Sequence, residues 1–278
     1  MPFRTIRASL YYLLLSVNCA LALVPGEMGF TDLQVKANSL TESGNLIEAA
    51  PYLKEIINRV EKSDSKDYDL AYPIFLIGTS SIQEYLRSND KSALNIALDW
   101  YDRLEKEYPN SPQLKPALLK RIDVLRALEK TDAAIELMQS ILDHKYSFSL
   151  KANEREKLIK DITQIYYGSN RLKDGIPYFN KLMSAAVSNN TRVLGAAAKF
   201  EALMEVEDYD ATIELLPWLT QEAEVRYKPR LNVALLKASD AMVKKARLNE
   251  ATIILNLIKT TDSMIEYHQT QIKIKQDQ

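Results

Sequence analysis

The residue types that most often carry chemistry are scarce in this chain and lie far apart. Its 278 residues include two histidines, His144 and His268, and one cysteine, Cys19. A metal site or an activated nucleophile needs several such groups at short, regular spacing. Neither histidine has a cysteine, a second histidine or a spaced set of carboxylates near it in the sequence. We therefore predict no metal site and no catalytic histidine.

Carboxylates are plentiful, and two close pairs, Asp67 with Asp69 and Glu222 with Glu224, have the residue types of a glycosidase acid and base. Such pairs are, however, common on helix surfaces. The sequence also lacks a Gly-rich phosphate loop, a G-x-S-x-G elbow and an H-E-x-x-H motif. We predict that the protein is not an enzyme and uses no cofactor.

The N-terminal residues have the layout of a secretory signal peptide. Arg4 and Arg7 form a short basic region, and an apolar run follows from Leu10 to Leu23. Small residues then stand at the −3 and −1 positions of a cut after Ala22. The run is about 14 residues long, whereas a membrane span needs roughly 20. We predict a signal peptide over 1–22, a linker over 23–29 and a secreted or periplasmic protein. The alternative is a membrane anchor formed by residues 8–24.

Cys19 lies inside this apolar run, so removal of the leader would leave no thiol for disulfides or zinc. Lipidation of Cys19 is an alternative. A bacterial lipidation signal has small residues just before the cysteine, and Asn18 fits this pattern poorly.

The composition favours a folded, helical protein without an affinity for nucleic acid. Apolar residues make up 46% and charged residues 26% of the chain, and glycines number only 7. The formal net charge is −1, so no overall basic field would attract a polyanion. We expect a protein or peptide partner instead, with membrane association only through that partner or an uncleaved N-terminal segment.

A spacing pattern recurs along the chain. A small residue is followed four positions later by a bulky one and seven positions later by an aliphatic or bulky one, and these offsets share one helical face. The matches are Ala49, Leu53 and Ile56; Ala97, Tyr101 and Leu104; Ala134, Met138 and Ile141; Gly175, Phe179 and Leu182; Ala211, Leu215 and Trp218; and Ala251, Leu255 and Ile258.

Each matched helix is expected to follow a partner helix, over 31–42, 68–86, 113–128, 153–167, 192–206 and 232–246. Short polar breaks between partners suit antiparallel hairpins. In the first break, Asn45 and Glu48 are spaced to cap the next helix reciprocally. The fold class predicted is all-α: an α-solenoid of about six antiparallel helix pairs over 30–262. A polar capping segment over 263–278 would follow.

The best-formed unit is similar to a tetratricopeptide repeat. That family places Ala, an aromatic residue, Ala or an aliphatic residue and a closing proline where this chain has Ala97, Tyr101, Leu104 and Pro109. The resemblance implies a right-handed superhelix that binds partners on its concave face. The run Glu-Tyr-Pro-Asn-Ser-Pro, which ends at Pro112, resembles bacterial cell-envelope members of the family, including outer-membrane assembly and Tol-Pal accessory proteins.

The resemblance thus implies a non-catalytic interaction scaffold, whose concave positions come from the first helix of each pair. Candidate partner-binding residues are Gln34, Asn38 and Phe200 at these positions, together with Trp100, which precedes Tyr101 in a second helix. The later concave positions, such as Ala196 and Leu203, are apolar. They would either hold an apolar peptide or helix, or pack the first helices together. A different function, binding a small ligand or nutrient at the outer membrane, would require a cluster of exposed aromatic side chains.

Overall fold

The structure is a computed structural model of the chain, and it describes residues 24–63, 68–185, 188–216, 219, 228–258, 269 and 272–273. Several predictions concern residues outside these ranges. They are the signal peptide or anchor with Cys19, the residues Asp67, Trp218 and His268, the pair at 222 and 224, and most of the segment 263–278. Within the described part, no helix combines the length and hydropathy needed to cross a membrane.

The described part is all-α, as predicted, and contains no β-strand. A short 3-10 helix, η1 (Pro25–Glu27), falls in the predicted linker. The first helices of the predicted pairs are α2 (Phe30–Glu42), α4 (Ala71–Ser88), α6 (Leu114–Ala127), α8 (Ala152–Gly168), α10 (Asn189–Glu205) and α13 (Lys228–Lys244). The second helices are α3 (Leu46–Lys62), α5 (Lys91–Glu107), α7 (Thr131–Leu142), α9 (Leu172–Ala185), α11 (Tyr209–Glu214) and α14 (Leu248–Asn256).

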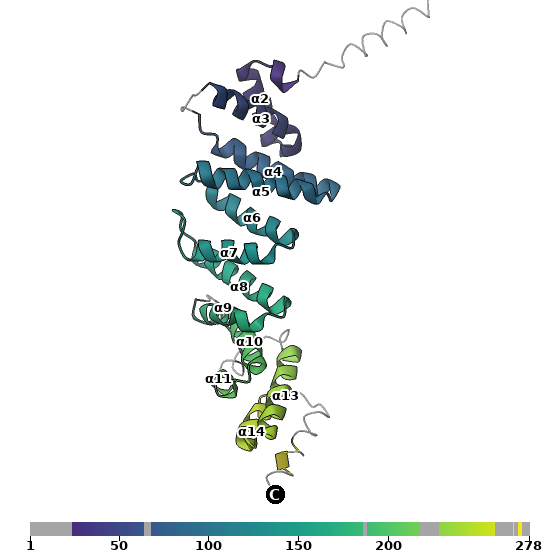
Figure 1. Cartoon of the computed structure of the whole chain (residues 1–278), viewed down its shortest axis with the longest axis vertical. Helices are drawn as coiled ribbons and strands as arrows, with labels where there is room; N and C mark the ends of the chain where they lie inside the picture. The colour runs from purple at the N-terminus through teal and green to yellow at the C-terminus, as the bar shows by residue number, and fades with distance from the viewer. Residues whose placement is uncertain are drawn as a thin grey trace, which may run out of the picture. The chain divides into compact units, whose positions relative to one another are not determined.

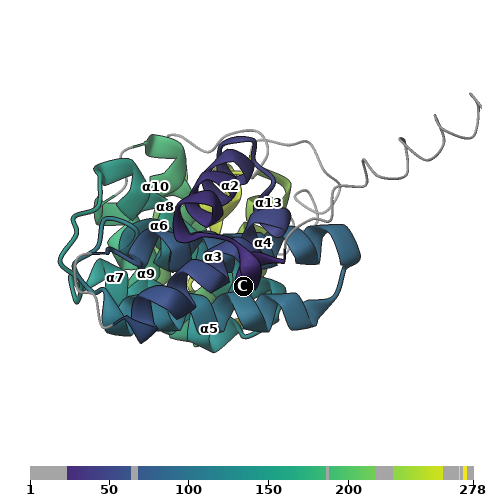
Figure 2. The same cartoon turned by 90° about the horizontal axis from the view of Figure 1, so that it is seen from above.

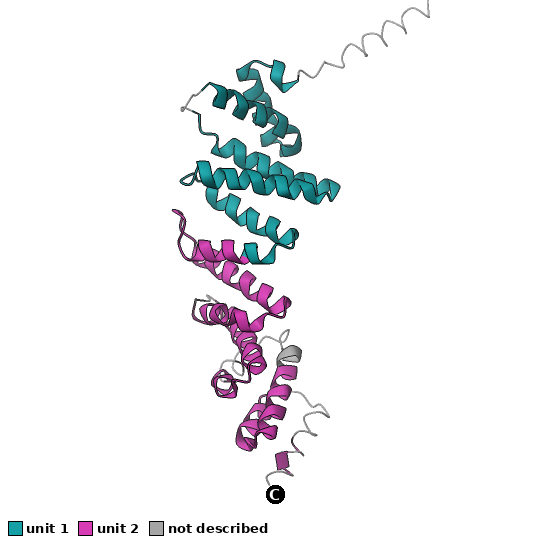
Figure 3. Ribbon diagram, in the orientation of Figure 1, with its two compact units in different colours: residues 1–134 teal, residues 135–278 magenta. Residues whose placement is uncertain are grey.

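The chain divides into two compact units, unit 1 (residues 1–134) and unit 2 (residues 135–278), with the boundary inside α7 (Figure 3). Within each unit, helices pack on their sequence neighbours, which is the arrangement of an α-solenoid. In unit 1, α2, α3, α4, α5 and α6 pack in succession. In unit 2, α8, α9, α10 and α11 do the same, and α13 packs on both α10 and α14.

The α4–α5 hairpin shows how the repeated pattern packs two helices. The helices lie side by side in both views (Figure 1, Figure 2). Ala97, Tyr101 and Leu104 of α5 are all fully buried. A Cβ atom added to Gly78 of α4 would lie only 2.5 Å from the Tyr101 ring, so the ring packs directly on the α4 backbone. Gly78, which is not part of the pattern, therefore allows α4 to approach the aromatic ring that the pattern places on α5.

In α9, Gly175 replaces the alanine of the pattern for a local reason. The Phe179 ring, one turn later, lies back over Gly175, where a Cβ atom would collide with it. Phe179 and Leu182 are fully buried. Gly195 of α10 lies close against the same part of α9, with its hypothetical Cβ 3.1 Å from the Phe179 carbonyl oxygen. Glycine at position 175 thus leaves room for the Phe179 ring, the bulky residue of the same pattern.

Every described hairpin contains a residue in the left-handed region at or just after the end of its first helix. These residues are Gly44, Asn89, Glu129, Asn170, Glu207 and Ala246, with φ between 56° and 78°. In five of the hairpins the next backbone N–H bonds back to the carbonyl five residues earlier, as from Lys130 to Leu125 and from Arg247 to Met242. This is the bonding of a Schellman motif, which satisfies carbonyls at the helix end.

The predicted reciprocal cap between Asn45 and Glu48 is wrong. The Asn45 N–H is already used, because it bonds to the Leu40 carbonyl at 2.9 Å in the Schellman motif of α2. The Asn45 side chain makes no capping hydrogen bond, and its ψ of 59° differs from the extended conformation typical of a capping residue. The Asn45 N–H therefore closes the end of α2 instead of bonding to the Glu48 side chain at the start of α3.

Candidate functional site

The predicted partner-binding residues fall into different environments. Gln34 and Asn38 lie one turn apart on α2. The Gln34 side chain is half-buried and donates from Nε2 to the Tyr68 hydroxyl at 3.2 Å, whereas Asn38 is exposed. Trp100, on α5, is half-buried and packs on the core of unit 1. The Arg103 guanidinium lies 5.5 Å from the centre of the Trp100 ring.

Phe200 cannot serve as a surface for a partner in this structure, because it is fully buried in the core of unit 2. Ala196 and Leu203 of the same helix are buried with it. Of the two alternatives that the sequence left open, the structure therefore shows packing at these apolar positions. Phe200 anchors α10 rather than facing a groove.

An open groove lies beside this buried stripe, on the first helices of unit 2. Its volume is about 410 Å³. The α10 wall consists of Glu201, Met204 and Glu205, which share one helical face. The α13 wall consists of Val233, Ala234 and Lys237, and the end of α8 and the start of α9 close the groove with Tyr167, Asn170 and Leu172. Charged side chains thus flank an apolar floor.

These groove residues were not among the candidates from the sequence. The predicted concave positions on α10 included Phe200 and Leu203, whereas the groove is lined by the neighbouring Glu201, Met204 and Glu205. A signal was present, since charged residues flanking Met204 at helical spacing indicate an edge between core and solvent.

A smaller groove of about 220 Å³ lies between first helices of unit 1. The α4 residues Ile82, Tyr85 and Leu86 line one side, and Leu86 is 75% exposed. Lys120, Asp123, Val124 and Ala127 of α6 line the other side, with Leu94 of α5. Each unit therefore has a groove between successive first helices, but the α4 wall is apolar where the α10 wall carries two carboxylates.

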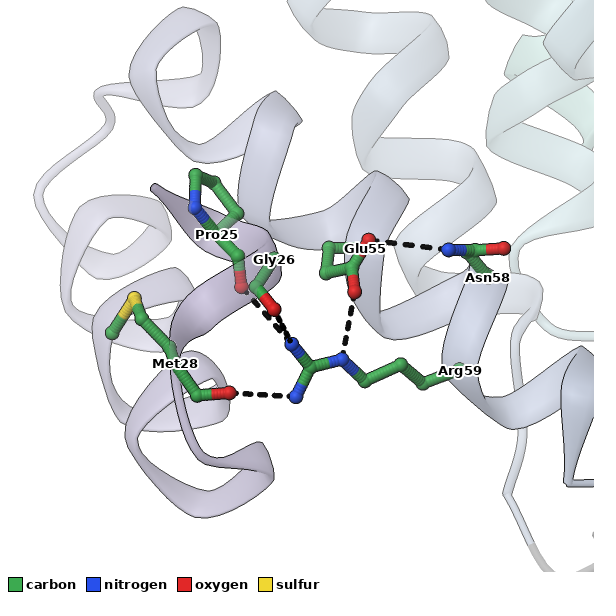
Figure 4. Close-up of polar contacts among 6 residues, drawn as sticks. All are labelled: Pro25, Gly26, Met28, Glu55, Asn58 and Arg59. Atoms are coloured by element: carbon green, nitrogen blue, oxygen red, sulfur yellow. Dashed lines mark hydrogen bonds and ion pairs between the residues drawn. The ribbon is translucent and has the colours of Figure 1, made fainter. Parts of the chain in front are cut away.

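A different polar cluster holds the residues before α2 against α3 (Figure 4). Arg59 donates from Nη1 to the Met28 carbonyl at 2.7 Å and from Nη2 to the carbonyls of Pro25 and Gly26 at 3.1 and 3.0 Å. Its Nε donates to Glu55 at 2.7 Å. These hydrogen bonds form an intrachain clamp, defined here as Arg59 with the carbonyls of residues 25, 26 and 28.

The Glu55 carboxylate, which accepts the hydrogen bond from Arg59 Nε, is itself held in the ionised form. Hydrogen bonds from Arg59 and from Asn58 Nδ2, the latter at 3.2 Å, lower the pKa of Glu55 from its ordinary value. Charge-assisted bonds of this kind are stronger than neutral ones. The guanidinium is thereby oriented, so that its Nη1 and Nη2 atoms face the three carbonyls.

The described residues contain no group of three or more His, Cys, Asp and Glu side chains that could hold a metal ion. His144 follows α7 in the left-handed conformation, with φ of 57°. It is exposed, and its Nε2 lies 3.4 Å from Arg155 Nη1.

The sequence matches no protein-family model and no curated protein. Among solved structures, it is similar to the crystal structure of a tetratricopeptide repeat protein from Parabacteroides merdae ATCC 43184. The two share 15% sequence identity with a TM-score of 0.45, over 89% of this chain and 87% of that chain.

Proposed function

We propose that this chain is a non-catalytic protein-interaction scaffold of the bacterial cell envelope, which binds a segment of a partner protein on its first helices. The observation that carries the proposal is the unit 2 groove of about 410 Å³. Its apolar floor and charged edges match the general composition of protein interaction surfaces, in which apolar anchors are surrounded by a polar rim.

The aromatic side chains favour a protein partner over a small ligand or nutrient. Such a ligand would need several exposed rings around one pocket. The unit 2 groove has one aromatic lining residue, Tyr167, and the unit 1 groove has one, Tyr85. Trp100 packs on the core. A set of exposed rings around either groove is therefore missing from the described part of the chain.

The envelope location rests on the predicted signal peptide over 1–22 and on the resemblance of the run ending at Pro112 to envelope proteins. It also determines where a partner should be sought. The membrane anchor over 8–24 is the alternative that would keep the same scaffold at the membrane surface.

Site-specific crosslinking with a matched pair of positions tests the scaffold. Val233 lines the unit 2 groove and is 54% exposed, whereas Ile253 lies on the second helix α14 and is 51% exposed. We expect p-benzoylphenylalanine in place of Val233 to crosslink an envelope protein in cells, and the same residue in place of Ile253 to crosslink much less. Equal capture at both positions, or none at position 233, would contradict the proposal.

A further inference from the structure

We propose that the unit 2 groove selects a partner segment in which a lysine or arginine stands beside an aliphatic side chain. The basic group would lie against α10 and the aliphatic group on the groove floor. This inference rests on the proposed function and specifies the chemistry of the partner.

The α10 wall supplies negative charge at a fixed place. Glu201 accepts a hydrogen bond from the Tyr167 hydroxyl at 2.6 Å, which orients the carboxylate. Glu205 follows one turn later on the same face and is exposed. In the described part of the chain, no cation pairs with Glu205. A basic group from a partner at Glu205 would therefore break no ion pair between described residues.

The α13 wall gives the groove a direction. Lys237 stands there with Val233 and Ala234, is exposed, and forms no ion pair with another described residue. An ammonium group on this wall repels a second cation, whereas the exposed Glu205 carboxylate on the α10 wall attracts it. A basic side chain is thus directed toward α10.

The floor supplies the apolar part of the site. Leu172 and Ala234 are nearly buried, Met204 is half-buried and Val233 stands exposed at the rim. A methionine adapts its flexible side chain to different apolar shapes. An aliphatic side chain entering between the charged edges would cover these atoms, and burial of apolar area provides affinity while the charges provide selectivity.

Three short fluorescent peptides test the inference by anisotropy with the full chain. They share their leucines and carry Lys, Glu or Gln at the remaining positions. We expect the Lys peptide to bind most tightly and its affinity to fall with added salt. Glu205→Gln should weaken it by about 1.4- to 5-fold, the range of one exposed ion pair. Glu205→Lys should weaken it further and strengthen binding of the Glu peptide.

Glu214→Gln and Glu214→Lys are the matched controls, because Glu214 is an exposed glutamate of α11 that does not line the groove. They should leave all three affinities unchanged, and thermal melts should show that every variant is folded. Tighter binding of the Glu peptide, absence of Lys peptide binding, or equal effects at positions 205 and 214 would overturn the inference. Crosslinking from position 233 then decides independently whether the proposed function stands.

Discussion

Tyr101 is a phenol enclosed by the α4–α5 hairpin. It is fully buried, and its hydroxyl lies 3.2 Å from Thr79 Oγ1. Burial raises its pKa to about 12, despite the opposing effect of the Thr79 hydrogen bond. The folded chain therefore favours the neutral phenol more strongly than the unfolded chain does, since an unfolded tyrosine titrates near pH 10.

This shift predicts alkaline destabilisation that depends on Tyr101. Its contribution is complete below about pH 10 and is lost as the pH rises from about 10 to about 12, at most about 2 to 3 kcal/mol. Tyr101→Phe should cost about 1 kcal/mol at neutral pH through the lost hydrogen bond. The variant should also lose less free energy of unfolding than the parent between neutral pH and about pH 11, as measured by urea unfolding at both pH values.

Tyr72→Phe provides the control, because Tyr72 is 48% exposed and lies in the same unit. It should change neither the neutral stability nor the slope against pH. A Tyr101→Phe variant that loses stability between neutral and alkaline pH as steeply as the parent would contradict the assignment.

At this scale, the sequence predicted what depends on spacing within one helix. Offsets of 0, 4 and 7 identified the buried face of α5 at Ala97, Tyr101 and Leu104. It did not identify the binding surface correctly, because Phe200 and Glu201 are adjacent in sequence but differ in exposure through the packing of neighbouring helices. One helix pattern alone does not determine which flank of the apolar stripe a neighbouring helix will cover.

The hairpin ends show the same limit at the scale of an element. The polar breaks between paired helices were predicted from their composition and are confirmed. The left-handed conformations of Glu129, Glu207 and Ala246 were not predicted, since residues with a Cβ atom disfavour that region by roughly 1–2 kcal/mol. The hairpin geometry imposes them, because the closing hydrogen bonds require that backbone turn.

This strain predicts opposite effects of the same substitution within one helical hairpin. Ala246→Gly should stabilise the chain by about 1 kcal/mol, because φ there is 58°. Ala241→Gly, inside α13, should destabilise it by about 1 kcal/mol, because glycine weakens a helix interior. Chemical denaturation measures both.

At the equivalent turn after α2, Gly44→Ala should lower the free energy of unfolding by about 1 kcal/mol, since φ at Gly44 is 78°. Destabilisation by Ala246→Gly would contradict this account.

For the whole molecule, the sequence predicted an α-solenoid over 30–262 and no division within it. The structure is all-α, and the chain divides into two compact units at a boundary inside α7. Composition could not reveal this division, because it depends on where contacts between successive helices are dense. The helical class itself was predictable, since the same packing face recurs along the whole array.

The N-terminal prediction also belongs to the whole molecule. Expressed in a bacterial host with its first 22 residues, the chain should be exported and begin at Leu23, as measured by intact mass and N-terminal sequencing of a periplasmic extract. Replacing both Ala20 and Ala22 with bulky residues should block the cut, because the peptidase accepts small residues at these positions. A wild-type chain that keeps residues 8–24 and remains in the membrane fraction would support the anchor instead.

The clamp at Arg59 has a consequence for how its target can change over evolution. In the segment before α2, the guanidinium bonds to the carbonyl oxygens of residues 25, 26 and 28, and every amino acid carries that atom. Substitutions among these three residues therefore leave the acceptors in place, whereas loss of Arg59 removes all three bonds at once. Selection can therefore conserve Arg59 while the amino acids at positions 25, 26 and 28 change. A tag fused ahead of residue 24 should leave these three hydrogen bonds intact.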